Sequence, residues 1–434
     1  SVVVNVNNCH LMITKGAVKN ILSACTSLAL ENDETKPLEE FRDELLKRYE
    51  EFGKQGFRTI GIAYKDVTTD PIITKDDEYE LTFLGFLLMF DPPKPEARQS
   101  LQDLKTSGIS IKLITGDNLS VASYLGKEVG LPAEECLTGS QLRLMSDEAL
   151  LHQVERITIF AETEPDQKER IVRMLQKSGH TVGYIGDGIN DVSAMKTADV
   201  GISVDTAVDI ARETADIVLL QRDLDVLQEG VREGRKTFLN TLKYIFITTS
   251  ANFGNMFSVA GASLFLPFLP LLPKQILLIN FISDLPAMAL TSDAVEKENL
   301  HTPQKWNSKL IRNFMIVFGL QSAVFDFLTF YMLYILFKAD ISEFRTGWFI
   351  ECVMTELMIL LIIRSGRPFL KSRPGKYLIS ISIFVAVLTY ILTFQPFASW
   401  LGLVQLPVKM LAGVFLLVVL YALTAEYTKK LFFR

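Results

Sequence analysis

Residues 186–191, GDGIND, place two carboxylates and an amide on one glycine-rich turn. The turn follows an apolar run, 182–185, so it lies at the carboxyl end of a predicted strand, where ligands of open α/β sheets bind. Carboxylates without a nearby histidine or cysteine suit a hard cation such as Mg²⁺, held together with a phosphate. We therefore expect Asp187 and Asp191 to hold Mg²⁺. The alternative is a solvated acidic turn, since short motifs often match by accident.

Two more predicted strand ends carry residues that suit a phosphate. Thr115, followed by Gly116 and Asp117, comes after the predicted strand 110–114 and can donate to a phosphate oxygen. Lys168 lies in the first turn of the helix predicted after strand 157–160, where the helix N-terminus also favours an anion. Taken singly, these residues read as a helix cap and a surface lysine. Together with GDGIND they predict a phosphate site with a metal ion.

The elements that position these residues alternate along the chain. Strands are predicted at 81–87, 110–114, 157–160, 181–185, 199–202 and 216–220. Helices are predicted at 95–107, 118–129, 146–154, 165–178, 189–197 and 206–213. This alternation argues for a mostly parallel, doubly wound sheet.

Residues 1–80 read as another unit, in which Lys15 and Arg58 flank strands and can contact nucleotide phosphates, although surface charge is the default interpretation.

The composition limits the function. The formal net charge of −6 gives no sign of a nucleic-acid partner. The four cysteines are scattered and form no CxxC pair or Cys/His cluster, so neither a zinc site nor a disulfide framework is expected. No signal peptide is present, and a first residue other than Met suggests a processed or partial chain.

Beyond about Lys236, long apolar stretches dominate. Because a helix needs about 20 apolar residues to cross a bilayer, we expect six membrane spans. They are 238–264, 274–292, 311–337, 346–363, 377–395 and 406–425. Lysine and arginine favour one set of connecting loops, which by the positive-inside rule puts the soluble half and the C-terminus in the cytoplasm. The richer set holds Lys297, Lys305, Lys309, Arg312, Arg364, Arg367, Lys371, Arg373, Lys376, Lys429, Lys430 and Arg434, and the opposite set holds Lys274, Lys338 and Arg345.

Polar residues inside the predicted spans are the second strong signal, because ionisable groups in a bilayer are expensive and usually functional. Pro286 is expected to break the second span and free a carbonyl one turn earlier, a device for ion coordination. Glu351 lies near the outer end of its span, where it can simply face water, so the deeper Glu356 is the better ligand. Helix–helix hydrogen bonding is the alternative for the Asn and Ser residues. The candidate ligands of a transported ion are Asn252, Asn255, Asn280, Ser283, Asp284, Asp326 and Glu356.

Several runs, in the same order, resemble the P-type cation-transporting ATPases over nearly the whole chain. They are MITKGA, GFRTIGIAY, FDPPKPEA, IKLITGDN, AETEPDQKERIV, GYIGDGINDVSAM and EGRKTFLNTLKYI. The resemblance implies three parts: 1–80, the end of an α+β nucleotide-binding domain; 81–236, an α/β haloacid-dehalogenase-like phosphorylation domain; and 237–434, an all-α transmembrane domain of six helices. It implies ATP and Mg²⁺ as cofactors, a transported divalent cation, and an integral membrane protein of the plasma (cell inner) membrane.

By position, the resemblance assigns roles to single residues. Lys15, Gly16, Arg58 and Gly116 match nucleotide-contacting positions. Thr115, Asp117, Lys168 and Asn190 match catalytic positions, and Asp187 and Asp191 match the magnesium loop. The loop of the family often begins with Thr, where this chain has Ile185.

The chain departs from the family at one decisive point. The phosphorylated aspartate of the family lies in DKTGT, and neither this string nor the actuator motif TGES occurs here. We therefore expect an N-terminally truncated chain that needs an upstream segment with the aspartate, the actuator domain and the first four helices. Residues 1–434 alone are expected not to form the aspartyl-phosphate. Half of a split transporter is an alternative, and a membrane-tethered phosphatase would need a DxD nucleophile that is not visible.

The resemblance also bears on the ion. The run SANFGNMFSVAGASLFLPFLPLLPKQILLINF is closest to the magnesium-transporting branch, whereas NFISDLP resembles the calcium pumps. Asn255 stands where calcium pumps have Glu, and fewer carboxylates suit a partly hydrated Mg²⁺ better than a stripped Ca²⁺. Transport of Mg²⁺ is the prediction, with Ca²⁺ as the alternative.

Overall fold

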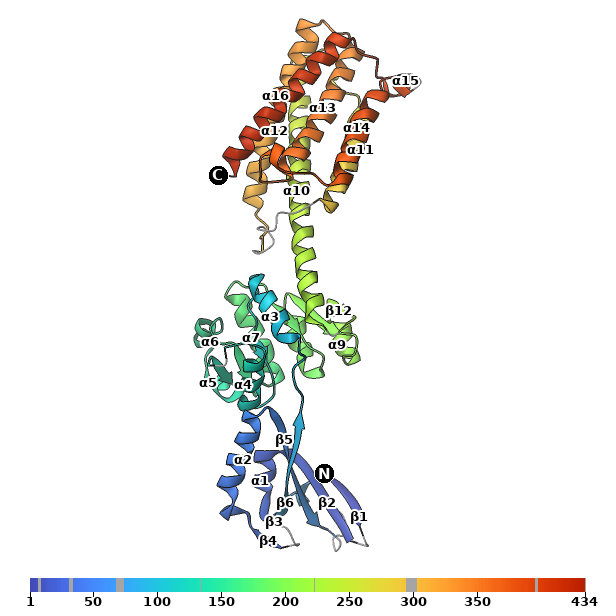
Figure 1. Cartoon of the computed structure of the whole chain (residues 1–434). Coiled ribbons are helices and arrows are strands. Elements are labelled where there is room, and N and C mark those ends of the chain that lie inside the picture. Colours follow the sequence, from blue (N-terminus) through green and yellow to red (C-terminus); the bar gives the residue numbers. More distant parts are fainter. Residues whose placement is uncertain are drawn as a thin grey trace. The chain divides into compact units, whose positions relative to one another are not determined.

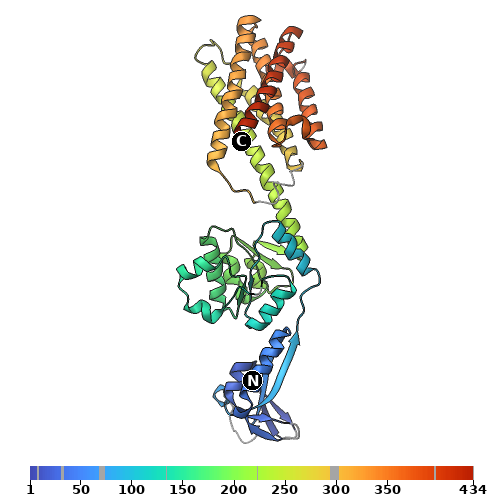
Figure 2. The same cartoon turned by 60° about the vertical axis from the view of Figure 1, so that its left-hand side comes forward.

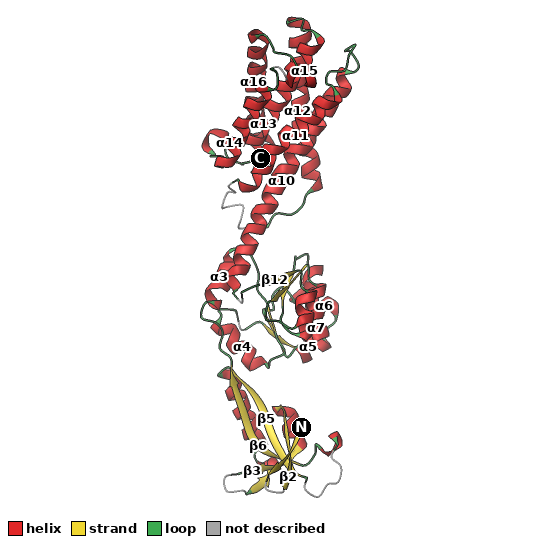
Figure 3. Ribbon diagram, turned by 90° about the vertical axis from the view of Figure 1, so that its right-hand side faces the viewer, coloured by secondary structure: helices red, strands yellow, loops and turns green. Residues whose placement is uncertain are grey.

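The structure, a computed structural model, describes residues 1–6, 9–30, 34–67, 74–132, 134–221, 223–293, 303–394 and 397–433. It divides into two compact units, Ser1–Glu229 and Gly230–Arg434 (Figure 1). The first unit contains all the described strands, and the second is helical (Figure 3). Lys297 and Arg434, which entered the loop-charge comparison, lie outside the described residues.

The N-terminal part of the first unit is a six-stranded sheet in the order β1-β2-β5-β6-β3-β4. Its strands are β1 (Val2–Val6), β2 (Cys9–Ala17), β3 (Cys25–Ala29), β4 (Thr35–Pro37), β5 (Phe57–Asp66) and β6 (Leu81–Phe90). Helices α1 (Val18–Ala24) and α2 (Arg42–Lys54) pack against this sheet (Figure 2), and η1 (Leu38–Glu40) and η2 (Lys75–Asp77) are short turns. Apolar residues of α1 and the strands form its core, among them Met12, Val18, Leu22, Ala63, Leu81 and Phe83.

Strand β6 corrects one prediction. It pairs antiparallel with β5, from Phe57 opposite Phe90 to Tyr64 opposite Thr82. The prediction that 81–87 belongs to the parallel sheet is therefore wrong. The reason is that a run of apolar residues indicates a strand but does not reveal which neighbour it pairs with.

The rest of the first unit consists of two parallel three-stranded sheets covered by helices. One has the order β7-β9-β8, with β7 (Leu113–Ile114), β8 (Cys136–Thr138) and β9 (Ile159–Ala161). The other has the order β10-β11-β12, with β10 (Gly183–Ile185), β11 (Val200–Val204) and β12 (Ile217–Leu219). The helices are α3 (Ala97–Thr106), α4 (Leu119–Glu128), α5 (Gly139–Leu144), α6 (Asp147–Gln153), α7 (Pro165–Lys177), η3 (Ile189–Asp191), α8 (Val192–Thr197) and α9 (Asp209–Thr214).

The α/β alternation is thus confirmed, but a single doubly wound sheet is not observed. Among the described residues, β7 and β10 are each at the edge of their own sheet. Ile114 of β7 and Val182, just before β10, nevertheless pack against the same two apolar clusters. Strand β8 and helix α5 were not predicted, because each is very short.

The second unit is built from long helices. They are α10 (Leu224–Ala262), which begins in the first unit, α11 (Pro273–Ala289), α12 (Ser308–Phe330) with the π-helical η6 (Tyr331–Leu336), α13 (Ile341–Ile363), α14 (Lys376–Ile391) and α16 (Val408–Phe432). Shorter elements are η4 (Leu290–Ser292), η7 (Phe369–Lys371) and α15 (Phe397–Leu401). Helix α13 is at the centre, since 78% of its apolar window is buried.

Three of the described helices are long and apolar enough to cross a bilayer, namely Ser308–Leu336, Ile341–Ile363 and Val408–Phe432. The chain is therefore a membrane protein. Helices α11 and α14 have 17 and 16 residues, fewer than the roughly 20 that a straight span needs. Helix α10 has 39 residues, but its N-terminal half is strongly charged. Helices thus cover all six predicted stretches, whereas six spans remain a prediction.

Candidate phosphate and cation sites

The loop after β7 is held by its own side chains. Thr115 Oγ1 donates to Asp117 Oδ2 over 3.0 Å, and the Asp117 N–H donates back to Thr115 Oγ1 over 3.1 Å. From the end of β9, Thr163 Oγ1 donates to the Thr115 carbonyl over 2.9 Å. Asn118 then caps α4 by accepting from the Val121 N–H over 2.9 Å. The two strand ends predicted to meet therefore do meet.

Arg58 reaches this loop from β5. Its Nη2 lies 2.8 Å from Asp117 Oδ2, and the hydrogen bond to Asp117 raises the pKa of the Arg58 guanidinium. Lys15 on β2 is exposed and pairs in register with Ile62 of β5. Because residues opposite each other share a face and side chains alternate along a strand, Lys15 and Arg58 lie on the same face of the sheet. A glycine at position 16 also suits the packing, because an added Cβ would lie 3.3 Å from the Ile21 side chain of α1.

Lys168 and Asp191 form a buried ion pair. Lys168 Nζ, in the first turns of α7, lies 2.8 Å from Asp191 Oδ1. The hydroxyl of Tyr184 on β10 donates to the same oxygen over 2.8 Å. Burial, and next the Asp191 charge, raise the pKa of Tyr184, so this phenol stays a donor. The predicted proximity of Lys168 to the GDGIND loop is therefore observed.

The GDGIND loop is shaped by its first glycine. A Cβ on Gly186 would lie 2.4 Å from Asp191 Cβ, so no larger residue allows Asp191 to turn toward Lys168. Ser203 of β11 is fully buried and donates to the Gly186 carbonyl over 2.9 Å, which fixes the turn from the neighbouring strand. Asp187 and Asn190 are exposed on the loop. The site thus has an inner carboxylate paired with a lysine and an outer carboxylate facing outward.

In the membrane unit, three predicted ligands meet. Asn255 Nδ2 of α10 donates to Glu356 Oε1 of α13 over 2.9 Å. Ser283 Oγ of α11 donates to the other carboxylate oxygen, Glu356 Oε2, and lies 2.8 Å from the Ile279 carbonyl. One side chain from each of three helices therefore converges on one point.

This point opens on a cavity of about 270 Å³. The predicted ligands Asn252, Asn280, Ser283, Asp284 and Glu356 are among its lining residues. Apolar side chains complete the wall, including Ile247, Leu357 and Leu360. All the polar lining residues of α11 and α13 present oxygen atoms, the donors preferred by hard cations.

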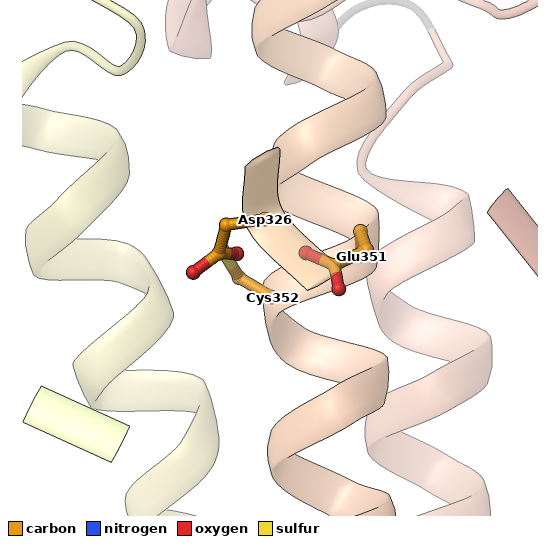
Figure 4. Close-up of side chains that lie close together, drawn as sticks. All are labelled: Asp326, Glu351 and Cys352. Carbon is orange, nitrogen blue, oxygen red and sulfur yellow. The ribbon is translucent and has the colours of Figure 1, made fainter. Parts of the chain in front are cut away.

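Asp326 lies in a separate group. It accepts hydrogen bonds from Ser258 Oγ of α10 over 2.6 Å and from Trp348 Nε1 of α13 over 2.7 Å. Glu351 and Cys352 of α13 lie beside it (Figure 4). The interpretation of Glu351 as a water-facing residue is wrong, because its side chain is 1% exposed. The position of Glu351 near the end of its predicted span did not reveal its burial, because other helices enclose α13.

The expected break at Pro286 is not observed. Helix α11 continues through Pro286 from Pro273 to Ala289. A proline removes one N–H donor, and a buried helix in a membrane protein tolerates this when neighbours supply other partners. Ser283 therefore acts from a continuous helix, and its hydroxyl rather than an unwound carbonyl faces Glu356.

Sequence reasoning missed three partners of these sites. Tyr184 precedes the loop and reads as an ordinary strand residue, while Ser258 and Trp348 read as helix-packing residues. The spacing of Ser258 from Asn255, one helical turn, was the one available signal that both face the same interior.

Comparisons with known proteins agree with this architecture. Residues 1–96 match the family model for the P-type ATPase cytoplasmic domain N, and residues 268–431 match the model for the cation transporting ATPase C-terminus. The chain is 41% identical over 440 residues to the magnesium-transporting ATPase, P-type 1, of Salmonella typhimurium, covering 100% of this chain and 49% of that protein. The protein of the same description from Escherichia coli K12 is 42% identical over 407 residues, 92% of this chain and 45% of that protein.

A calcium-transporting ATPase of Bacillus subtilis is more distant, at 29% identity over 406 residues, 90% of this chain and 46% of that protein. The chain spans about half the length of the curated relatives it matches. Two parallel sheets with acidic residues at their strand ends, followed by apolar helices with buried acids, agree with the cytoplasmic and membrane parts of such ATPases. The chain belongs to the P-type cation-transporting ATPases.

Proposed function

We propose that this chain is part of a P-type ATPase that couples ATP hydrolysis, through an aspartyl-phosphate, to transport of Mg²⁺ across a membrane. The observation that carries the ion site is the convergence of Asn255 and Ser283 on Glu356 beside a polar cavity. Oxygen donors alone, two of them carboxylates, suit a hard cation, and space around them suits an ion that keeps part of its water. The main relatives carry magnesium transport in their names, which supports the same choice.

In the soluble unit, the residues fit a phosphate group and Mg²⁺. Asp187 is exposed on the loop and is the first ligand we assign to Mg²⁺, which would neutralise phosphate charge when bound. Asp191, the second ligand we assign to Mg²⁺, also pairs with Lys168 and accepts a hydrogen bond from Tyr184. Thr115 and Asp117 form the opposite wall, with Gly116 between them. Arg58, Lys15 and Gly16 are assigned to the nucleotide, and Asn190 to the outer edge of the loop.

The acceptor aspartate is proposed to come from a segment outside residues 1–434. Strands β7 and β10 are edges in the described part of the chain, and edge strands present unpaired backbone groups to another strand. A strand between them would join both parallel sheets into one haloacid-dehalogenase-like sheet. It would also bring its carboxyl end between Thr115 and Lys168. The domains we propose are 1–80, 81–236 and 237–434, except that β6 (Leu81–Phe90) belongs to the N-terminal sheet. We further propose that the soluble part and the C-terminus are cytoplasmic, that six helices cross the plasma membrane, and that the upstream segment is required.

A binding experiment tests the ion site. Ser283→Ala removes one donor to the Glu356 carboxylate, and such a loss costs about 1.5–3 kcal/mol, or roughly tenfold or more in affinity. Ser263→Ala is the matched control, because Ser263, directly after α10, also donates to a backbone carbonyl but is exposed. We expect Mg²⁺ affinity, measured by calorimetry on the detergent-purified chain, to fall for Ser283→Ala and not for Ser263→Ala. Equal affinities for both variants would contradict the assignment.

A further inference from the structure

Asp326, Glu351 and Cys352 form a second acidic group inside the membrane unit. Their three ligand atoms lie within 4.8 Å of one another, and all three side chains are buried. Figure 4 shows the Glu351 carboxylate turned toward Asp326 and Cys352. The group combines two carboxylates with a thiol, a donor class that the Asn255–Ser283–Glu356 site lacks.

One carboxylate oxygen of this group has no hydrogen-bond partner. Glu351 Oε2 is buried without a hydrogen-bond partner, and the Glu351 side chain is 1% exposed. Among the described residues, no lysine, arginine or histidine lies within ion-pair distance of Asp326 or Glu351. Burying carboxylates without a compensating charge costs several kcal/mol per ion, so the group must hold either a cation or a proton.

Asp326 is held in a fixed orientation from behind. Ser258 Oγ donates to its Oδ2 over 2.6 Å, and Trp348 Nε1 donates to its Oδ1 over 2.7 Å. Each oxygen keeps a second lone pair, and Cys352 Sγ lies 4.0 Å from Oδ1. Hydrogen bonds of this kind orient ligating carboxylates in metal sites.

We propose that Asp326, Glu351 and Cys352 bind a divalent transition-metal cation of the Zn²⁺ or Co²⁺ class. A thiolate selects softer metals over Mg²⁺ and Ca²⁺, while the two carboxylates supply negative charge. Three protein ligands leave a fourth position for water or for bidentate coordination by a carboxylate, as zinc sites allow. The thiol proton leaves when the metal binds.

The proposed site is distinct from the Mg²⁺ site but lies along the same helices. Ser258 follows Asn255 by three residues on α10, and Glu351 precedes Glu356 by five residues on α13. At 1.5 Å of rise per residue, the two sites are about 4.5–7.5 Å apart along the helices. A transition metal bound here would therefore lie next to the ion path without using its ligands.

Co²⁺ absorption tests this proposal directly, because thiolate ligation produces a charge-transfer band that oxygen ligands do not. The chain is prepared with Cys9, Cys25 and Cys136 replaced by serine, so that Cys352 is the one remaining thiol. Titration of the metal-free, detergent-purified chain with Co²⁺ should produce the charge-transfer band, and added Zn²⁺ but not excess Mg²⁺ should abolish it. Further Cys352→Ser should remove the band, and Ser258→Ala should weaken Co²⁺ affinity about tenfold.

Ser283→Ala is the control for the neighbouring site and should leave the band unchanged. If Cys352→Ser does not fold, Glu351→Gln in the same three-serine chain takes its place, with an expected loss of at least about tenfold in Co²⁺ affinity. Absence of the band in the folded three-serine chain would overturn the proposal and leave a proton shared by Asp326 and Glu351. A band that survives Cys352→Ser would overturn it too. An unchanged Mg²⁺ affinity in Ser283→Ala, with the band intact, would count against the proposed function alone.

Discussion

Lys168 Nζ lies 2.8 Å from Asp191 Oδ1, and both side chains are largely buried. The lysine comes from a helix that follows β9, whereas the aspartate comes from the loop that follows β10. This ion pair is therefore one of the contacts that join the β7-β9-β8 sheet to the β10-β11-β12 sheet, together with hydrogen bonds from Gln176 to Thr197 and from Ser193 to Glu169. It also fixes a cationic group beside the loop that we assign to phosphate and Mg²⁺.

We predict that Lys168→Met destabilises the soluble unit by about 3 kcal/mol, because breaking a buried ion pair leaves the other charge uncompensated. Lys177→Met, an exposed lysine of the same helix, is the matched control and should change stability by less than about 0.5 kcal/mol. Urea unfolding followed by circular dichroism measures both. Similar urea unfolding midpoints for the two variants would show that the ion pair contributes little to the stability of the soluble unit.

Gly56 provides a test of how α2 and β5 meet α4. Its φ is +86°, and a Cβ there would lie 2.5 Å from the ring of Tyr124. Gly56→Ala should therefore cost more than the roughly 1–2 kcal/mol of a left-handed alanine. Gly179, with φ +87° and open space around it, is the control, so Gly179→Ala should cost only that backbone term. Thermal melting distinguishes them, and Tyr124→Ala should rescue part of the Gly56→Ala loss; no rescue would mean that the ring is not the obstacle.

Cys25 gives a pH dependence with a defined sign. Burial raises the pKa of the Cys25 thiol from 9.0 to about 11, with the nearby Arg42 charge opposing the shift. Because the folded-state pKa is above the unfolded one, the neutral thiol contributes stability fully below pH 9, and this contribution is lost as the pH rises through 11. The lost term is up to about 3 kcal/mol.

Cys25→Ala removes this titration, so the Tm difference between the parent chain and the variant should shrink from pH 8 to pH 11. Other titrating groups are common to both proteins and cancel in the difference. A Tm difference that is constant over this range would contradict the assignment of the pKa shift to burial of Cys25.

The sequence allowed the proximity of the strand ends to be predicted, because parallel strands place their carboxyl ends at one edge of a sheet, whereas the phosphate site itself stays a prediction. Lys168 reaches the GDGIND loop, whereas the hydrogen bond from Thr115 to Asp117 was not predicted. Tyr184 was missed because a strand tyrosine looks the same whether its hydroxyl is free or bonded to an aspartate. The partners of β6 were wrong because pairing is decided by distant residues.

The membrane site was harder to predict, because polar residues inside helices carry no information on which helices adjoin. Asn255, Ser283 and Glu356 were grouped correctly, since each lies deep in its helix. Asp326 was placed with them, yet it contacts Ser258 and Trp348 instead. Glu351 was underrated because depth along a helix says nothing about enclosure by neighbours.

We predict that residues 1–434 alone do not form an acid-stable phosphoenzyme with radiolabelled ATP and Mg²⁺, because the chain has no DKTGT aspartate. Adding the upstream segment of the same protein should restore the label. Lys168→Met in that complete protein should reduce labelling by at least about tenfold, because one charge that stabilises phosphoryl transfer is lost. An acid-stable label on residues 1–434 alone would show that another residue accepts the phosphate.

The central claim is that the oxygen site around Glu356 selects Mg²⁺. The most direct measurement is the ATPase rate of the complete protein at fixed MgATP while free Mg²⁺ and Ca²⁺ are varied separately. We predict saturable stimulation by free Mg²⁺ that is lost in Glu356→Gln and retained in the exposed control Glu233→Gln. Stimulation by micromolar Ca²⁺ with no response to free Mg²⁺ would contradict the claim and assign the site to calcium.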